Sequence, residues 1–409
     1  GLTSVDSLKQ IGMKCTGTQP WENMEVACDQ IPQVVGSTAA NVYFPKVESA
    51  LDIPPYSNFS RFGGISSLIR LDDRFEVVKN NYADSDGGGN PLLPGLIASI
   101  ADKVGCEVQD VRRTIEEDLH GEVGGQDNDF EDILGSEWHA LRVVDNNEDL
   151  RDRFVTTHFY AKEFLTDSSF CEFLLDIVQV HKLREVRSLV GFNRYERTND
   201  TDKFVPSGLS DNMNWLPAIE VYGEGLFLSL DEEKLRIWEN ESGIAKRYGV
   251  LNDRLDMSRW SDWIPKASPR FVLLHTLAHL LMRELCYDCG YSSAALRERI
   301  YSSGLDEPGT HMAGILIYTA SGDSEGTMGG LVRQGTPYNI GRIIKNALDR
   351  AVWCSNDPVC QEIVGQGTYS LNLAACHACS LVPETSCIYG NSVLDRRSIV
   401  GLGSFFTLD

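Results

Sequence analysis

Apolar positions recur at helical spacing in several parts of the chain, and two of these segments also carry helix-start signals. Pro269 opens a helix predicted from Arg270 to about Cys286, because proline fits the first helical position. Asp231 is a typical N-cap residue, and the acidic first turn that follows it favours a second helix there. The same spacing predicts further helices over Leu92 to about His120, Ser292–Tyr301 and Tyr338–Trp353.

Other segments have the β-branched, alternating character of strands. Strands are predicted at Asn41–Pro45, Ser188–Phe192 and His311–Tyr318. Residues Ala218–Leu230 are predicted to form a β-hairpin whose turn is Gly223-Glu-Gly225. Since helical and strand patterns are mixed along the chain, we expect an α/β (mixed α+β) protein with more than one domain.

Breaks in these patterns divide the chain into three predicted domains. Residues 1–60 end at the breaker Ile53-Pro54-Pro55 and read as an incomplete module. Residues 61–265 are predicted to be a mixed α/β middle domain, and residues 266–409 a C-terminal domain. The first residue is glycine and no signal peptide follows, so we expect the sequence to begin within a longer chain.

Charge and hydropathy limit the partners of this chain. Its 409 residues carry a formal net charge of −22, which disfavours binding of nucleic acid by the chain alone. The longest apolar run, Phe271–Met282, contains two histidines and is shorter than the about 18 apolar residues of a membrane span, so we expect a soluble protein. A local basic face remains as a candidate DNA contact, although a solvated surface is the simpler interpretation. Its residues are Arg333, Arg342, Lys345 and Arg350.

The cysteines favour metal binding over disulfides. Five of the eleven lie between Cys354 and Cys387, in a chain without a signal peptide, which indicates a reducing, cytoplasmic location. Two ligand pairs, Cys354-x5-Cys360 and Cys376-x2-Cys379, can supply the thiolates of a tetrahedral Zn²⁺ site. Cys387 could replace Cys360 as the fourth ligand. His377, which lies between Cys376 and Cys379, is a weaker candidate. A site closed by thiolates leaves no position for water, so its metal would be structural.

Two further constellations could carry chemistry. His275-x3-His279 places both imidazoles on one helix face, as in zinc proteases, but Thr276 stands where the general-base glutamate would be. Packed core histidines are the simpler interpretation, and a site with Cys286 and Cys289 is an alternative. The loop from Asp323 to Gly330 could bind an anion or a divalent ion, or simply connect two elements.

Near the start, Cys15 and Cys28 cannot close a zinc site by themselves. If they are ligands, the remaining ligands must come from elsewhere. Two buried thiols without a metal are the alternative.

Several longer segments resemble the DrmB family, the helicase-associated component of the DISARM anti-phage defence system, which shares a C-terminal zinc-binding domain with MrfA- and MrfB-type proteins. The most specific are His275–Leu281, Cys289–Tyr301, Gly326–Leu331, Ala374–Cys379, Pro383–Cys387 and Leu394–Arg396. The segments Cys15–Trp21, Cys28, Asn41–Pro45 and Ser49–Pro55 resemble the same family.

The resemblance implies a partner of a DrmA-like helicase, in a complex that engages invading DNA. It implies Zn²⁺ bound by Cys354, Cys360, Cys376 and Cys379 in a helicase-associated domain, and it assigns no catalytic residue. It also implies that residues 1–60 are the remnant of a zinc-ribbon-like module, with Cys15 and Cys28 as half of a second site.

Three functions follow as hypotheses. The first is a non-catalytic subunit that binds a helicase and helps it to hold DNA, because no ATPase or nuclease signature is present. The second is a metal-dependent nuclease or hydrolase that acts on foreign DNA through His275, His279, Asp323 and Glu325. The third is a regulatory module that senses a ligand through the glycine-rich loop.

Overall fold

The computed structural model describes residues 7–17, 27–29, 31–32, 43–53, 69, 74–83, 93–104, 108, 111–112, 114–115, 133–142, 154–165, 169–194, 204–207, 215–304, 310–319 and 330–406. The chain divides into two compact units that alternate along the sequence. One consists of residues 1–50, 186–221 and 252–266, and the other of residues 51–185, 222–251 and 267–409. The division into three domains stays a prediction.

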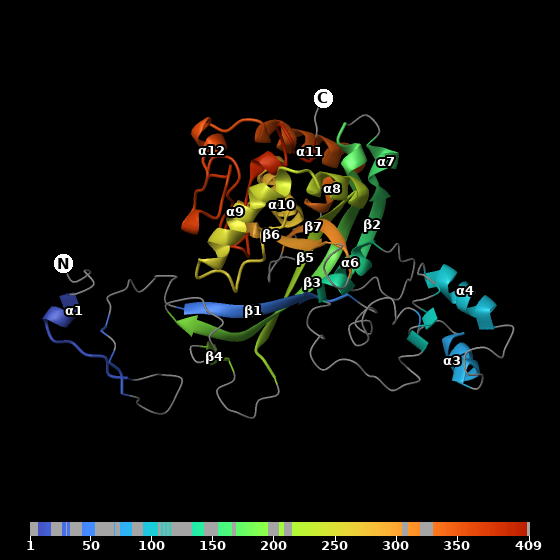
Figure 1. Cartoon of the computed structure of the whole chain (residues 1–409), viewed down its shortest axis with the longest axis horizontal. Helices are drawn as coiled ribbons and strands as arrows, with labels where there is room; N and C mark the ends of the chain where they lie inside the picture. Colours follow the sequence, from blue (N-terminus) through green and yellow to red (C-terminus); the bar gives the residue numbers. More distant parts are fainter. Residues whose placement is uncertain are drawn as a thin grey trace. The chain divides into compact units, whose positions relative to one another are not determined.

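Helix α10 (Pro269–Cys289) is the central helix of the second unit. The hydroxyl of its N-cap Ser268 accepts a hydrogen bond from Phe271 N at 3.2 Å, and Gly290 in a left-handed conformation ends the helix. From Phe271 to Leu285 the helix carries buried apolar side chains on all of its faces, as expected for a helix covered on all sides. It packs against α11 (Pro337–Ala351) and against two strands, β6 and β7, as Figure 1 shows.

A largely antiparallel sheet lies beside this helix. In the second unit the strand order is β3-β5-β7-β6, with β2 paired to β3. In the first unit β1 and β4 both pair with the far end of β3. The bounds are β1 (Tyr43–Leu51), β2 (Val155–Tyr160), β3 (Leu174–Arg194), β4 (Phe204–Pro206), β5 (Ala218–Leu230), β6 (Leu296–Ser303) and β7 (Met312–Thr319).

The remaining helices are short, and one of them, α6 (Ile133–Arg142), covers a face of the sheet. Its Trp138 packs against Phe227 and Tyr301, with ring centroids 5.5 and 6.1 Å away. Within the described residues, no helix has both the length and the apolar character needed to cross a membrane. The others are α1 (Ser7–Gln10), α3 (Phe75–Ala83), α4 (Leu93–Val104), α7 (Ala161–Phe164), α8 (Glu232–Glu239), α9 (Ile244–Asp256) and α12 (Val359–Glu362).

Most elements predicted from local patterns are confirmed. Asp231 caps α8 by accepting a hydrogen bond from Lys234 N, and α10 begins at Pro269. Helix α11 and strand β7 lie within one or two residues of their predicted bounds. Helix α4 begins as predicted and ends at Val104, and the next described residues, 108, 111–112 and 114–115, are again helical.

Two predictions are wrong. Residues 292–301 do not form a helix: a short 3-10 turn leads into β6, which pairs with β7 along its whole length. Its charged Glu298 and Arg299 are buried and have partners from other elements, so tertiary contacts outweigh their helical propensity. Residues 218–230 form one continuous strand instead of a hairpin.

The glycines expected to form that turn serve another purpose. Gly223 and Gly225 lie along β5 beside β7, where a Cβ on Gly223 would come within 1.6 Å of the Thr319 carbonyl oxygen. Glycine is needed there because the two backbones approach more closely than a side chain permits.

Replacing Gly223 with alanine is therefore expected to lower the free energy of unfolding by about 1–3 kcal/mol through overpacking. Gly243→Ala is the matched control, since nothing lies within 4 Å of its added Cβ. Urea unfolding of both variants measures the difference, and equal midpoints would show that β5 and β7 separate without cost.

Candidate metal centre

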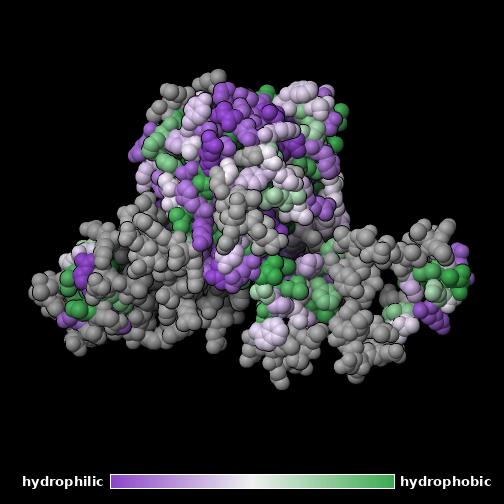
Figure 2. Space-filling model, turned by 180° about the vertical axis from the view of Figure 1, so that it is seen from behind, coloured by the Kyte–Doolittle hydropathy of each residue, from purple (hydrophilic) through white to green (hydrophobic). Residues whose placement is uncertain are grey.

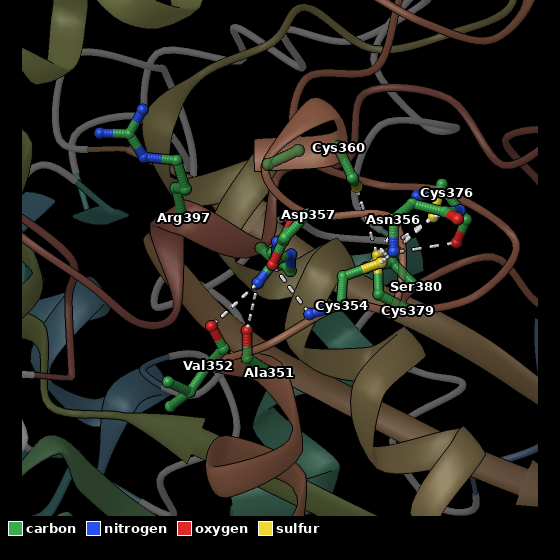
Figure 3. Close-up of polar contacts among 12 residues, drawn as sticks. Ala351, Val352, Cys354, Asn356, Asp357, Cys360, Cys376, Cys379, Ser380 and Arg397 are labelled. Carbon is green, nitrogen blue, oxygen red and sulfur yellow. Dashed lines mark hydrogen bonds and ion pairs between the residues drawn. The ribbon is translucent and has the colours of Figure 1, made fainter. Parts of the chain in front are cut away.

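Three neighbouring segments of the tail bring four sulfur atoms together. Cys354 follows the end of α11, Cys360 lies on α12, and Cys376 and Cys379 belong to one tight turn in which Cys379 N donates to the Cys376 carbonyl. Figure 3 shows their side chains converging on one point. The four Sγ atoms lie within 4.8 Å of one another, so the structure brings together the ligand set predicted from the sequence.

The spacing of these sulfur atoms fits a tetrahedral zinc ion. The measured Sγ–Sγ distances are 3.5 Å for Cys354–Cys376, 3.8 Å for Cys360–Cys379 and 3.8 Å for Cys376–Cys379. A Zn–S bond of about 2.3 Å places neighbouring sulfurs of a tetrahedron about 3.8 Å apart. Because the four thiolates would fill every position, the arrangement suits a structural ion.

Polar groups around the cluster stabilise negative charge on sulfur. Asn356 donates its backbone N–H to Cys354 Sγ at 3.4 Å and its side-chain amide to Cys376 Sγ at 3.3 Å. Burial raises the pKa of Cys376, but the hydrogen bonds from Asn356 and Cys354 outweigh it and lower this pKa to about 7. Burial and the neighbouring thiols raise the pKa of Cys354 to about 11. Without a cation, the thiols therefore resist ionising together.

A buried arginine holds the first ligand pair in place. Arg396 is 1% exposed and donates to the carbonyls of Ala351 and Val352 at 2.8 and 3.2 Å. It also forms an ion pair with Asp357, whose other carboxylate oxygen accepts from Cys354 N at 2.8 Å. The end of α11 and the turn between the two cysteines are thus joined by one side chain, which lies in the family-like segment Leu394–Arg396 but was assigned no role from the sequence.

The other candidate ligands of the tail lie elsewhere. His377 is exposed and does not belong to the four-sulfur group. Cys387, the alternative fourth ligand, is buried in a different cluster with His275, His279 and Glu298. Glu298 was missed because residues 292–301 were expected to be helical; a strand assignment there would have pointed to it.

The histidine pair does not resemble the active site of a hydrolase. His275 and His279 are both 0% exposed, so a polymeric substrate cannot reach them. Asp323 and Glu325, their expected partners, lie outside the described residues, as does most of the loop up to Gly330. Cys286 belongs to neither metal-ligand group of the described part of the chain, and the side chain of Cys289 is not described.

The predicted basic face lies on and just before α11, and its residues are exposed. Arg342 forms an ion pair with Asp288 at 2.8 Å, and Lys345 pairs with Asp349 at 2.8 Å. Arg350 pairs with Glu284 at 3.1 Å and stacks over Tyr287. Hydrophilic residues gather across the top of Figure 2, where Figure 1 places α11. Three of the four predicted DNA-contacting cations, all but Arg333, are thus partly neutralised by carboxylates.

The N-terminal cysteines are both half-buried, and Cys15 Sγ accepts a hydrogen bond from Gly17 N at 3.4 Å. Across the described ranges, neither Cys15 nor Cys28 joins a group of three or more metal-ligating side chains. Their assignment as half of a second zinc site stays a prediction.

Comparison with known proteins agrees with this geometry. Residues 277–380, which include all four clustered cysteines, match the MrfA Zn-binding domain. The DISARM protein DrmB of Bacillus paralicheniformis is 33% identical over 404 residues, which cover 95% of this chain and 68% of that protein. The similarity extends far beyond the zinc-binding domain, and the chain therefore belongs to the DrmB family of DISARM proteins.

Proposed function

We propose that this chain is a non-catalytic subunit of a DISARM anti-phage complex, and that one structural Zn²⁺ bound by Cys354, Cys360, Cys376 and Cys379 organises its tail. The observation that carries the proposal is the closed four-sulfur cluster within a matched zinc-binding domain. A metal held by four thiolates has no position left for a reacting water or substrate. The DISARM role rests on the similarity to DrmB along 95% of the chain.

The partner in this proposal is a DrmA-like helicase that provides most of the DNA contact. A chain with a net charge of −22 repels the phosphate backbone at long range, so its contribution must be local. The exposed basic side chains on α11 are the candidates for that contribution. Lys345 is the best placed, because its partner Asp349 is itself exposed and can exchange for a phosphate.

DNA binding can be measured for the chain, the helicase and their complex over a range of salt concentrations. We expect the chain alone to bind weakly, and the complex to bind more tightly than the helicase alone. Lys345→Ala should weaken binding by the complex and reduce its salt slope by about 1, as expected for one phosphate contact.

The matched control for this experiment is Lys246→Ala, which removes another exposed lysine, from α9. It should leave both affinity and salt slope unchanged. Equal affinities of chain and complex, or failure of the chain to co-purify with the helicase, would reject the proposed partnership.

A further inference from the structure

A second group of metal-ligating side chains is buried in the second unit, apart from the four cysteines. His275 and His279 lie one turn apart on α10, Glu298 lies on β6, and Cys387 lies in the tail beyond the cysteine turn. All are buried: the histidines are 0% exposed, Glu298 1% and Cys387 3%. Segments separated by more than 100 residues thus direct two nitrogens, a carboxylate and a sulfur at one point.

The distances within this group match the edges of a small coordination tetrahedron. His275 Nε2 lies 3.2 Å from Glu298 Oε1 and 3.3 Å from Cys387 Sγ, and His279 Nε2 lies 3.4 Å from Glu298 Oε2. Zn–N bonds of about 2.0 Å and one Zn–S bond of about 2.3 Å separate neighbouring ligand atoms of a tetrahedron by about 3.3–3.5 Å. The side chains therefore surround a space of the right size for one ion.

Three of the polar atoms that face this space have no hydrogen-bond partner in the described part of the chain. Both oxygens of Glu298 and Nε2 of His279 are buried, and none has a hydrogen-bond partner in the described part of the chain. Buried carboxylate oxygens without hydrogen bonds are rare, because their desolvation is not repaid. A cation between these atoms would satisfy all of them at once.

The tautomer of His279 agrees with a ligand role. Its Nδ1 lies 2.9 Å from the Ser380 carbonyl oxygen, which can only accept, so Nδ1 carries the proton. In the neutral ring, Nε2 then directs its lone pair toward the cluster. A second hydrogen bond that fixes a histidine in this way is typical of metal ligands.

Charge leads to the same conclusion. Two neutral imidazoles, one carboxylate and one thiolate carry a charge of −2, which one divalent cation cancels in this dry surrounding. The rings of Phe271 and Tyr389, 5.4 and 5.2 Å from the His275 ring, shield the group from water.

We infer that His275, His279, Glu298 and Cys387 form a second, structural binding site for a divalent transition metal, with Zn²⁺ as its natural occupant. Imidazole and thiolate ligands select borderline ions over Mg²⁺ and Ca²⁺, which prefer oxygen. The matched zinc-binding domain begins after His275 and ends before Cys387, so it does not contain this site as a whole. The site connects α10 and β6 to the tail, and Ser380 links it directly to Cys379 of the first site.

The first test requires no variant. The purified full chain should contain two zinc ions by elemental analysis, and zinc X-ray absorption should give about 2.5 sulfur ligands per ion, the mean of a four-sulfur and a one-sulfur site. One ion with four sulfurs in a folded chain would overturn the inference and leave the group as a buried ion pair only.

Variants then locate the second ion. Cys387→Ala should remove one zinc and raise the sulfur count toward four, whereas Cys286→Ala, on the same helix as the histidines, should keep both ions. Cys15→Ala tests whether the second ion is instead bound near the N-terminus. This variant should keep the same zinc content as the parent chain. Two ions retained in Cys387→Ala, or one lost in Cys15→Ala, would contradict the assignment.

Discussion

Replacing Cys360 with alanine is expected to release zinc and unfold the tail of the chain. A structural zinc site contributes an apparent binding free energy of about 10–16 kcal/mol. Whole domains are stable by only about 5–15 kcal/mol, so the segment after α11 cannot remain folded when its ion is lost. This segment has little regular secondary structure of its own, since α12 has only four residues. Elemental analysis and limited proteolysis should show loss of at least one zinc and new cleavage sites after Ala351.

Two further variants make this result interpretable. Cys286→Ala removes a half-buried thiol that belongs to neither cluster, and it should retain the zinc content and melting temperature of the parent. Cys360→His keeps a ligand at the same position and should preserve most of the zinc, because imidazole also binds this ion. A Cys360→Ala protein with unchanged zinc and unchanged proteolysis would show that the cluster is not the metal site.

Removal of the Glu137 carboxylate is expected to destabilise the chain almost as severely. Glu137 is 1% exposed on α6 and accepts hydrogen bonds from Leu51 N, Arg299 Nη2 and Tyr301 Oη at 2.8, 2.7 and 2.9 Å. Burial raises its pKa, while the adjacent Arg299 opposes this shift. Glu137→Ala would remove the buried carboxylate that pairs with the guanidinium of Arg299, at a cost of about 3–5 kcal/mol in the free energy of unfolding.

Urea unfolding distinguishes this effect from simple loss of volume. Glu137→Ala/Arg299→Met should recover part of the stability, because the second change removes the buried charge that Glu137 balances. Asp349→Ala breaks an exposed ion pair with Lys345 and should have little effect. If Glu137→Ala matched that control, the buried network would contribute nothing to stability.

Local sequence determined the elements whose signals lie within a few residues of one another. The caps at Asp231 and Ser268 and Pro269 in the first turn fix where α8 and α10 begin, since each acts on the adjacent turn. The spacing of Cys354, Cys360, Cys376 and Cys379 was equally informative, because the ligands of structural zinc sites often come in closely spaced pairs. The family was also recognisable from segments of the sequence alone.

Tertiary structure decided what depends on partners distant in the chain. The charged segment Arg297-Glu298-Arg299 reads as a helix, but it forms β6 because Glu137 of α6 pairs with Arg299 and His275 of α10 lies beside Glu298. Gly223 was predicted to form a turn, but it lies in β5, where the absence of a side chain allows β7 to approach closely. The position of Cys387 beside His275, 112 residues away, could not be read from spacing, because long-range packing and not local geometry sets that distance.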